Sequence, residues 1–558
     1  MVKKISPLAI VIFFTVLAGL GLLHSGLIPT HDGEYHIVRF YEFNQSLQDG
    51  NWYPRWAPDL NYGFGVPLFN YVYPFPNYIA SCIHTLGFSF IDAFKLNLFM
   101  ATIVGGIFFY LWAKMFWGEI GGIVSSTFYS FSPYRLVDIY IRGSVGEVWA
   151  LSFFPAFLWS ATSFFQKRNE YYLLLSSIFL ALTILSHNIL ALMFFFFDCS
   201  YIVFLIFTVK KRSDYVYQSI FLILLGLGLS SIFWIPALIE KNFVTGLEIF
   251  DYQAHFPEVY QLLIPSWGSG FSGGNLGEQM SFQIGLANLF AVTLGILCII
   301  LYFSRKQVFL AKTIIFSLLF FSFIFFMMTR LSIPIWEKIS LLRYFQFPWR
   351  FLSITILLTS FLAGGIFPLL RKNQKLFMGS FMILVTFLLG YGYAKPAYYQ
   401  NRNDDYYLNK SIFIDGTNSP GNYFNTIWIN TRPKREPEKL KINKGKGSIK
   451  INFIKSTHYN FSTHAETQIE ILVNTAFFPG WAAYIDNKQQ ELSKSTAGLF
   501  MFNIPSGDHQ VEVKFENTLT RNISQILSGM ALIYISYQLL FNLKRQKKYG
   551  NDKSTHLI

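Results

Sequence analysis

The sequence has 558 residues, of which 53% are hydrophobic and only 14% are charged, and it contains 62 phenylalanines. A soluble protein would carry roughly a quarter charged residues, whereas this chain has recurrent apolar runs of about 20 residues, long enough to cross a hydrocarbon core of roughly 30 Å. The composition therefore excludes a soluble globular protein and predicts an α-helical polytopic membrane protein.

The net charge of +14 does not indicate a protein that binds nucleic acid. Lysines and arginines stand at the ends of apolar runs, where the positive-inside rule places them on the cytoplasmic side, and no basic domain with interleaved aromatic residues occurs. The three cysteines, Cys82, Cys199 and Cys298, are widely separated, so the sequence offers neither a disulfide framework nor a zinc-binding pattern.

About twelve membrane-spanning helices are predicted. The first covers Pro7 to Leu27 behind Lys3 and Lys4, and the lack of a small-residue cleavage site favours a retained helix over a signal peptide. Further helices are expected at about 96–112 and 120–131, and then ending near residues 167, 186, 210, 239, 305, 329, 371 and 391.

With the N-terminus in the cytoplasm, the alternation of these helices places every basic cluster on one face of the membrane and every long connection on the other, as the positive-inside rule requires. Residues 1–394 are therefore predicted to form a membrane domain with four extracytoplasmic segments. These segments are residues 28–90, 132–147, 240–283 and 331–350.

Residues 395–521 are predicted to form an extracytoplasmic, mainly β domain. Stretches such as Gln468–Val473 and Gln510–Phe515 alternate between polar and apolar residues, and this period of two is typical of antiparallel strands. Residues 522–558 are expected to form a final helix at about 523–541 and a basic tail, which returns the C-terminus to the cytoplasm.

The first extracytoplasmic segment carries an unusual concentration of charge, in the stretch from Thr30 to Arg39. Asp32 is expected at a membrane–water boundary, where partial desolvation raises the pKa of a carboxylate and suits it to act as a general base toward a hydroxyl. The same residue also fits a purely structural role, as the N-cap of a helix that begins at Glu34. The two interpretations are compatible.

His36 and Arg39 follow Asp32 at i+4 and i+7, so the three share one face if this piece is helical. That face would present a base, an imidazole and a guanidinium, and Arg39 could hold a phosphate through two parallel hydrogen bonds. The alternative is a solvated amphipathic helix at the membrane interface.

The second extracytoplasmic segment contains Asp138, flanked by Arg135 and Arg142, and Glu147 follows where the next helix begins. So many charges in a short aromatic loop indicate a site for a phosphate and a carboxylate. The helix dipole alone would also favour Glu147 at that position.

His187 lies at a turn between two helices, where a packed or hydrogen-bonded role is the common one. Arg343 and Arg350 stand where the last segment of the membrane domain re-enters the membrane, and they either grip a lipid phosphate or merely extend to the headgroups. Asp198 inside a helix is interpreted as a structural hydrogen-bonding residue. Because His31 and His36 are five residues apart and do not share a helix face, no metal site or cofactor is predicted.

An acidic residue just after the first helix, many spans and an extracytoplasmic domain near the C-terminus together resemble the GT-C glycosyltransferases, which use polyprenyl-phosphate-linked sugars. Several short stretches resemble bacterial membrane proteins described as 6-pyruvoyl-tetrahydropterin synthase-related, a label that implies no pterin chemistry. Phe478–Trp481 and Ile504–His509 resemble the C-terminal domain of YfhO-type membrane proteins. The stretches similar to the first family are Gly50–Trp56, Tyr62–Pro67, Tyr140–Gly143, Ser186–Asn188 and Phe347–Arg350.

This resemblance implies a multi-pass glycosyltransferase of the bacterial plasma (inner) membrane, which takes a sugar from a polyprenyl-phosphate donor to a glycan, lipid or protein acceptor outside the cell. Asp32 matches the position of the family's catalytic acid, and whether Glu34 shares that role stays open. The expected substrate-binding residues are His36, Arg39, Arg55, Arg142, Glu147, His187, Arg343 and Arg350. The alternatives are a flippase for lipid-linked saccharides and a non-catalytic membrane protein whose β domain binds a glycan or a partner.

Overall fold

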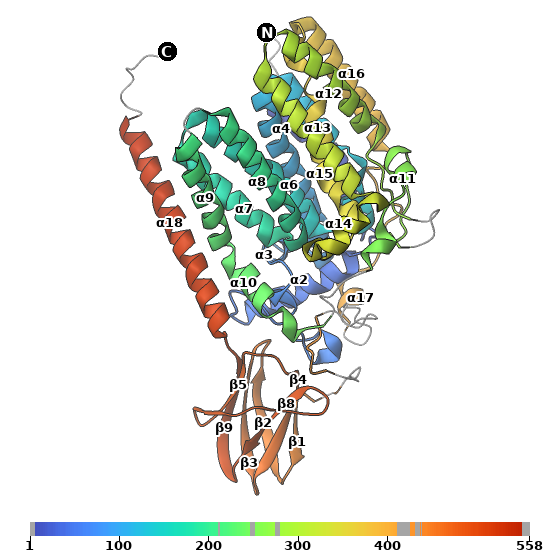
Figure 1. Cartoon of the computed structure of the whole chain (residues 1–558). Coiled ribbons are helices and arrows are strands. Elements are labelled where there is room, and N and C mark those ends of the chain that lie inside the picture. The colour runs from blue at the N-terminus through green and yellow to red at the C-terminus, as the bar shows by residue number, and fades with distance from the viewer. Residues whose placement is uncertain are drawn as a thin grey trace.

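The computed structural model describes residues 6–209, 212–245, 251–273, 279–409, 424–429, 436 and 438–549. It shows a bundle of long helices with a β domain at one end, while both termini lie at the opposite end (Figure 1). We call the end of the bundle that carries the β domain the β-domain end. The predicted fold class, a helical membrane protein with a β domain before the last helix, is confirmed.

The helices that build the bundle are apolar over most of their length. They are α1 (Pro7–Gly19), α4 (Phe90–Ser130), α6 (Val145–Lys167), α7 (Glu170–Ser186), α8 (Asn188–Thr208), α9 (Arg212–Leu229), α10 (Ser231–Ile239), α12 (Leu286–Ser304), α13 (Val308–Met327), α15 (Leu352–Ala363), α16 (Lys372–Tyr391) and α18 (Leu519–Tyr549). The remaining helices are α2 (Gly33–Gln48), α3 (Phe75–Thr85), α5 (Pro133–Val137), α11 (Val259–Leu263), α14 (Ile333–Lys338) and α17 (Asp404–Leu408), and the π-helical turn η4 (Asp138–Arg142) follows α5.

Among the described residues, eight helices are long and apolar enough to cross a membrane, or nine if the bent pair α9–α10 is one span. This is fewer than the twelve predicted, for two reasons. Two further apolar helices, Pro7–Leu23 and Glu170–Ser186, fall just short of the required length. In addition, α4 is one helix by this measure although it folds back on itself.

The fold-back of α4 occurs at Gly118, whose backbone has φ 73° and ψ −178°, a combination that is essentially restricted to glycine. The Ser126 hydroxyl donates a hydrogen bond of 2.7 Å to the Gly106 carbonyl, whereas these residues would lie about 30 Å apart in a straight helix. The element is therefore a pair of antiparallel helices, in agreement with the predicted helices at 96–112 and 120–131.

Replacement of Gly118 by alanine is expected to destabilise the protein by about 1–3 kcal/mol, because alanine has no low-energy conformation at this turn. The matched control is Gly392→Ala at the end of α16, where φ is −58° and the added methyl also meets open space. Thermal unfolding in detergent measures both variants. Equal midpoints for the two would show that the fold-back does not depend on Gly118.

The break between α9 and α10 bends the pair by 73°, and its backbone groups are satisfied by the final helix. The Ser528 hydroxyl of α18 accepts from the Ile232 amide at 2.8 Å and lies 3.0 Å from the Leu229 carbonyl. An unsatisfied backbone group in lipid costs several kcal/mol. Packing against α18 therefore explains why a broken helix is stable here.

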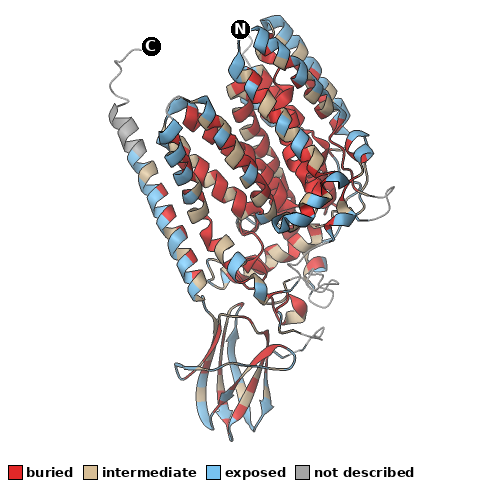
Figure 2. Ribbon diagram, viewed as in Figure 1, coloured by how far each residue is buried: buried red, intermediate tan, exposed pale blue. Residues whose placement is uncertain are grey.

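Buried residues concentrate in the middle of the bundle, along α6 and α15, whereas α16 and α18 are exposed over most of their surface (Figure 2). The exposed side chains on these peripheral helices are largely leucine, isoleucine and phenylalanine, such as Phe377 and Ile533. Apolar faces of this kind on the outer helices suit contact with lipid, because the bilayer interior contains no water. The charged residues discussed below lie at the β-domain end of the central helices.

The β domain consists of two antiparallel sheets, with strand orders β1-β4-β8-β7 and β2-β3-β9-β5-β6. Residues from both sheets, including Phe461, Ile471, Trp481 and Phe500, form one apolar core. The predicted alternating stretches lie largely in β4 and β9, as expected. The strands are β1 (Leu440–Lys444), β2 (Gly447–Ile454), β3 (His458–Ala465), β4 (Ile469–Ala476), β5 (Trp481–Ile485), β6 (Lys488–Gln490), β7 (Ser493–Lys494), β8 (Leu499–Ile504) and β9 (Gly507–Phe515).

Candidate functional site

The two charged stretches singled out in the sequence lie side by side at the β-domain end. The backbone amides of His31 and Asp32 donate hydrogen bonds of 2.9 Å to the carbonyls of Ile141 and Arg142, respectively. The start of α2 is thereby attached to the turn η4, which leads into α6. Asp32 and Arg142 are therefore neighbours along their backbones.

Glycines make this close approach possible. Gly143 has φ 64°, and a Cβ at this position would lie 2.3 Å from the Thr30 hydroxyl, a distance that real Cβ contacts do not reach. A Cβ on Gly146 would similarly collide with the ring of Tyr73. The Tyr140–Gly143 stretch therefore requires glycine at its end, both for its left-handed backbone and for its close contact with Thr30.

Asp32 occupies the N-cap position of α2, but its side chain makes no capping hydrogen bond. The hydroxyl of Thr30 accepts from the Gly33 amide instead, at 3.1 Å. The sequence-based interpretation of Asp32 as a capping side chain is therefore wrong, because Thr30 takes that role. Within the described part of the chain, no hydrogen-bond or ion-pair partner holds the Asp32 carboxylate, which is half-buried.

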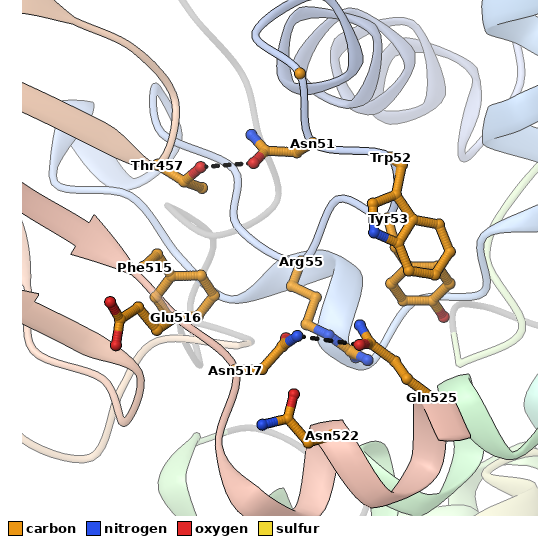
Figure 3. Close-up of a pocket in the computed structure, with 11 residues that line it drawn as sticks. Asn51, Trp52, Tyr53, Arg55, Thr457, Phe515, Glu516, Asn517, Asn522 and Gln525 are labelled. Atoms are coloured by element: carbon orange, nitrogen blue, oxygen red, sulfur yellow. Dashed lines mark hydrogen bonds between the residues drawn. The ribbon is translucent and has the colours of Figure 1, made fainter. Parts of the chain in front are cut away.

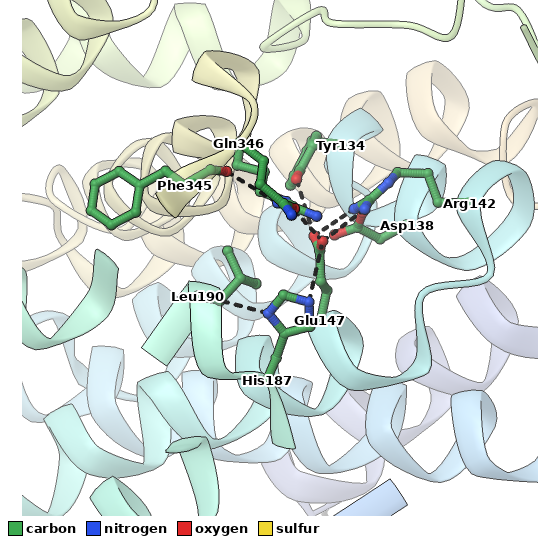
Figure 4. Close-up of polar contacts among 9 residues, drawn as sticks. Tyr134, Asp138, Arg142, Glu147, His187, Leu190, Phe345 and Gln346 are labelled. Atoms are coloured by element: carbon green, nitrogen blue, oxygen red, sulfur yellow. Dashed lines mark hydrogen bonds and ion pairs between the residues drawn. The ribbon is translucent and has the colours of Figure 1, made fainter. Parts of the chain in front are cut away.

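Glu147, in the first turn of α6, is fully buried and lies at the centre of an ion-pair network (Figure 4). Arg142 binds it through two parallel hydrogen bonds, from Nη1 to Oε2 at 2.5 Å and from Nη2 to Oε1 at 2.7 Å. Arg350 donates from Nε to Oε1 at 3.1 Å, and Asp138 lies 2.6 Å from Arg142 Nη1. Charge-assisted pairs with this geometry are among the strongest hydrogen bonds in proteins.

The network contains two carboxylates and two guanidiniums, so its formal charge is zero. Arg142 uses both of its terminal nitrogens on Asp138 and Glu147, and Arg350 also donates to the Gln346 side chain and the Phe345 carbonyl. The helix dipole can favour Glu147 at this position, but it does not account for the hydrogen bonds from the two arginines. Through these bonds, Arg142 and Arg350 hold together the backbone segments that carry them and Glu147.

His187 joins the network from the start of α8. Its Nδ1 accepts from the Leu190 amide at 3.1 Å, and its Nε2 lies 3.7 Å from Glu147 Oε1. Its ring lies against Tyr73, with ring centroids 5.0 Å apart. Burial raises the pKa of Tyr73, and the charges of Arg39, Asp32, Glu147 and Arg142 also act on its hydroxyl. Tyr73 therefore packs against His187 at the edge of the network.

His36 and Arg39 of α2 have different surroundings, although helical spacing predicts a shared face. His36 is buried between Phe40 and Phe94, with ring centroids 5.6 and 6.0 Å away, and burial holds its pKa well below the usual value. The imidazole of His36 is neutral and buried among phenylalanines, so it is not accessible to a substrate in this structure. Arg39 is half-buried, and no described residue pairs with its guanidinium.

Glu34 and His31 line a separate cavity of about 240 Å³, together with Tyr140, Tyr398 and Gln400. His31 is covered by the segment 240–283, since its Nε2 lies 2.8 Å from the Ser269 carbonyl and its ring stacks on Phe271. Burial lowers the pKa of His31. Glu34 therefore faces a different space from the network around Glu147.

Two predicted binding residues lie outside the Glu147 network. Arg55 is buried at the junction with the β domain, where it donates to the Asn70 side chain at 2.8 Å and to the Ile232 carbonyl at 3.0 Å. Among the described residues, the Arg343 guanidinium donates only to the Glu337 carbonyl, at 3.3 Å. Neither contacts Glu147, so the structure does not place them with the other predicted residues.

Sequence reasoning missed several participants. Tyr73 and Gln346 contact the network but carry no charge that would single them out. A second buried ion pair, between Glu240 and Arg521 at 2.9 Å, connects α10 to α18; in the sequence these residues mark only the start of the segment 240–283 and the end of the β domain. In the described parts of the chain, no group of three or more histidine, cysteine, aspartate or glutamate side chains could hold a metal ion.

Two solved structures of the Archaeoglobus fulgidus oligosaccharyltransferase are similar to this chain. The apo form is 14% identical, with a TM-score of 0.42, over 73% of this chain and 57% of that one. The form tethered by a disulfide bond to an acceptor peptide containing the NVT sequon is 12% identical, with a TM-score of 0.38 and the same coverage. The chain thus spans little more than half the length of that protein. No curated protein matches the chain.

The family described as "6-pyruvoyl-tetrahydropterin synthase related domain; membrane protein" matches residues 69–396, which is more than half of the sequence. The matched region contains the Glu147 network with Arg142, His187 and Arg350, and it begins after Asp32 and Arg39. Because so much of the chain is covered, the chain belongs to this 6-pyruvoyl-tetrahydropterin synthase-related family of membrane proteins.

Proposed function

We propose that this protein is an integral membrane glycosyltransferase, which transfers a sugar from a polyprenyl-phosphate donor to a glycan, lipid or protein acceptor at the β-domain end. One observation carries the proposal. A half-buried carboxylate, Asp32, and a half-buried guanidinium, Arg39, lie on one helix beside a buried network, and no described residue neutralises either of them. Their separation of seven residues corresponds to about 10 Å along the helix, room for a sugar between an acceptor hydroxyl and a phosphate.

In this reaction Asp32 takes the proton of the acceptor hydroxyl, and the resulting oxygen attacks the anomeric carbon of the donor. The bond between that carbon and the phosphate oxygen breaks, and the electron pair leaves with the polyprenyl phosphate. Arg39 stabilises the negative charge that develops on the leaving phosphate, an effect that is strong where water is excluded. A positioned general base and such a charge partner are the two groups that this transfer needs.

The Glu147 network has a positioning role in this proposal. Arg142 and Arg350 have their charges balanced by Glu147 and Asp138, so they are less suited than Arg39 to hold a phosphate. Because the carbonyl of Arg142 accepts from the Asp32 amide, the network fixes the backbone that carries the proposed base. A packed and fully hydrogen-bonded support of this kind holds a reactive group in one orientation.

The flippase alternative predicts broken helices with polar groups available at mid-membrane. The bent pair α9–α10 is such a break, but Ser528 of α18 fills it and satisfies its backbone groups. The break therefore has a structural explanation, and no observation on the described residues specifically favours transport.

The proposal is tested with the purified full chain in lipid vesicles. Radiolabelled polyprenyl-phosphate hexoses and pentoses are supplied as donors, with a cell-envelope extract as the source of acceptor. Transfer of label from the polyprenyl phosphate to a glycan, lipid or protein of the extract is the expected result. If none of these donors loses its sugar to any acceptor in the presence of the folded protein, the proposed function is wrong.

Replacement of Arg39 by alanine is expected to slow transfer by about 10²- to 10³-fold, since it removes a charge partner of the leaving phosphate. Arg39→Lys should recover part of the loss, because a lysine keeps the charge without the bidentate geometry. Arg330→Ala is the matched control, as the Arg330 side chain is 58% exposed and forms an ion pair with Glu258. Initial rates of transfer measure the three variants, and an unchanged rate in Arg39→Ala would exclude this role.

A further inference from the structure

A second cavity, of about 460 Å³, lies at the junction of the bundle and the β domain (Figure 3). Three parts of the sequence that are distant from one another form its walls: residues 50–55, Thr457 between β2 and β3, and residues 515–525, which lead from β9 into the first turns of α18. We call this cavity the junction cleft. It shares no lining residue with the Glu147 network.

The walls of the junction cleft are held together by direct hydrogen bonds, so the cleft is preformed. The Asp49 carboxylate accepts from the amide and the hydroxyl of Ser456, at 2.7 and 2.5 Å. The Thr457 hydroxyl donates to Asn51 at 2.9 Å. On the opposite side, the Tyr78 hydroxyl donates to the carbonyl of Trp52 at 2.6 Å and fixes the backbone from which that indole projects.

The chemistry of the lining is that of amides and aromatic rings. The ring of Trp52 projects from this fixed backbone, and the residue is 64% exposed. Asn517 donates to Gln525 at 3.1 Å, and Asn522 adds a carboxamide for which no described residue is a partner. Such groups offer donors and acceptors together, and they match hydroxyl groups, which also donate and accept.

The charges in the cleft argue against an ionic ligand. Arg55 is 4% exposed, with its terminal nitrogens bound to Asn70 and Ile232, and its Nε has no described partner. The one carboxylate, Glu516, accepts from the Tyr484 hydroxyl at 2.8 Å. One cation and one anion, both engaged elsewhere, leave a lining that is electrically neutral.

We propose that the junction cleft binds a neutral saccharide, whose sugar face stacks on Trp52 while its hydroxyl groups bind the carboxamides of Asn517, Asn522 and Gln525. An apolar ring with a few convergent polar groups is the general pattern of a small-molecule site. The binding requires no transfer reaction, so it stands apart from the proposed function. If both hold, the cleft is positioned to receive the glycan that accepts the sugar.

The test uses the full chain in lipid nanodiscs without any lipid-linked donor. Neutral oligosaccharides of the cello, malto, chito and manno series are titrated by calorimetry, with oligogalacturonate as the acidic comparison. We expect at least one neutral series to bind and oligogalacturonate to bind more weakly. Absence of binding by all the neutral series, or tighter binding of oligogalacturonate, would overturn the proposal.

Trp52→Ala is expected to weaken this binding by about tenfold or more, the loss that corresponds to one good contact, and Trp52→Phe should retain most of it. Removal of the indole should leave no cavity, because Trp52 is 64% exposed. It should also leave the backbone in place, because Tyr78 binds the carbonyl of Trp52 and not its ring. Asn522→Ala should weaken binding as well. The matched control is Asn452→Ala, an exposed carboxamide on β2 that pairs with Asn460. Equal affinities in Trp52→Ala and Asn452→Ala would show that the saccharide does not occupy the cleft.

Discussion

Replacement of Glu147 by alanine is expected to destabilise the protein by about 3–5 kcal/mol, because removal of one partner of a buried ion pair leaves an uncompensated charge. Two guanidiniums lose their hydrogen bonds to Glu147 at once, because the paired bonds from Arg142 and the single bond from Arg350 all end on this carboxylate. Asp138 continues to bind Arg142, so the larger share of the loss is expected from Arg350. Thermal or chemical unfolding in detergent provides the measurement.

The control for Glu147→Ala is Glu258→Ala, which removes the carboxylate of an exposed ion pair with Arg330. An exposed pair contributes about 1 kcal/mol or less, so the two variants should differ clearly. Adding Arg350→Met to Glu147→Ala removes the second charge and should restore part of the stability, a coupling that a double-mutant cycle measures. If Glu147→Ala unfolds at the same midpoint as Glu258→Ala, the network does not stabilise the native state.

The elements of this protein could be predicted because each follows from local sequence. Apolar runs fix the long helices, and alternation fixes β4 and β9, whatever lies around them. The fold-back of α4 also had a local signal, because the apolar run is interrupted at Gly118 and Glu119. The number of membrane spans does not follow from local sequence in the same way, because α7 and the first helix are short and whether they cross the membrane depends on their neighbours.

The side chains that meet at the site could be predicted only in part, since pairing between distant segments leaves no local pattern. Glu147 and Arg350 are 203 residues apart, and Glu240 and Arg521 are 281 apart. Charge and loop position indicated that Arg142, Glu147 and Arg350 belong to one end of the bundle. Nothing in the sequence showed that both arginines would form ion pairs with the same carboxylate.

His36 and Arg55 show a second limit of reasoning from sequence. Helical spacing places His36 on one side of α2 with Asp32 and Arg39, but it does not reveal that Phe94 of another helix covers the imidazole. Arg55 lies in a stretch that is similar to a known family, but this similarity does not show where in the fold the stretch lies. In the structure the residue belongs to the junction cleft, a place formed by three segments that only the fold brings together.

Asp32→Asn is expected to reduce glycosyl transfer by about 10²- to 10⁴-fold, the usual contribution of a general base, while the protein folds as before. The amide has nearly the shape of the carboxylate but cannot take a proton at neutral pH. Folding should be spared because no described residue depends on the Asp32 side chain: the capping bond comes from Thr30, and the bond to Arg142 comes from the Asp32 backbone. Initial transfer rates and unfolding midpoints of the same preparation give both quantities.

Glu34→Gln separates the roles of the two carboxylates at the start of α2. Glu34 lines the cavity with Tyr398 and Gln400, so its replacement should leave the transfer rate within about threefold, well below the loss of a general base. Asp32→Glu keeps the base but moves it by one methylene group, and a displacement near 1 Å costs about 10²-fold where orientation matters. A large loss in Glu34→Gln with a normal rate in Asp32→Asn would transfer the role of base to Glu34. Loss in both would mean that the two carboxylates act together across the turn that begins α2.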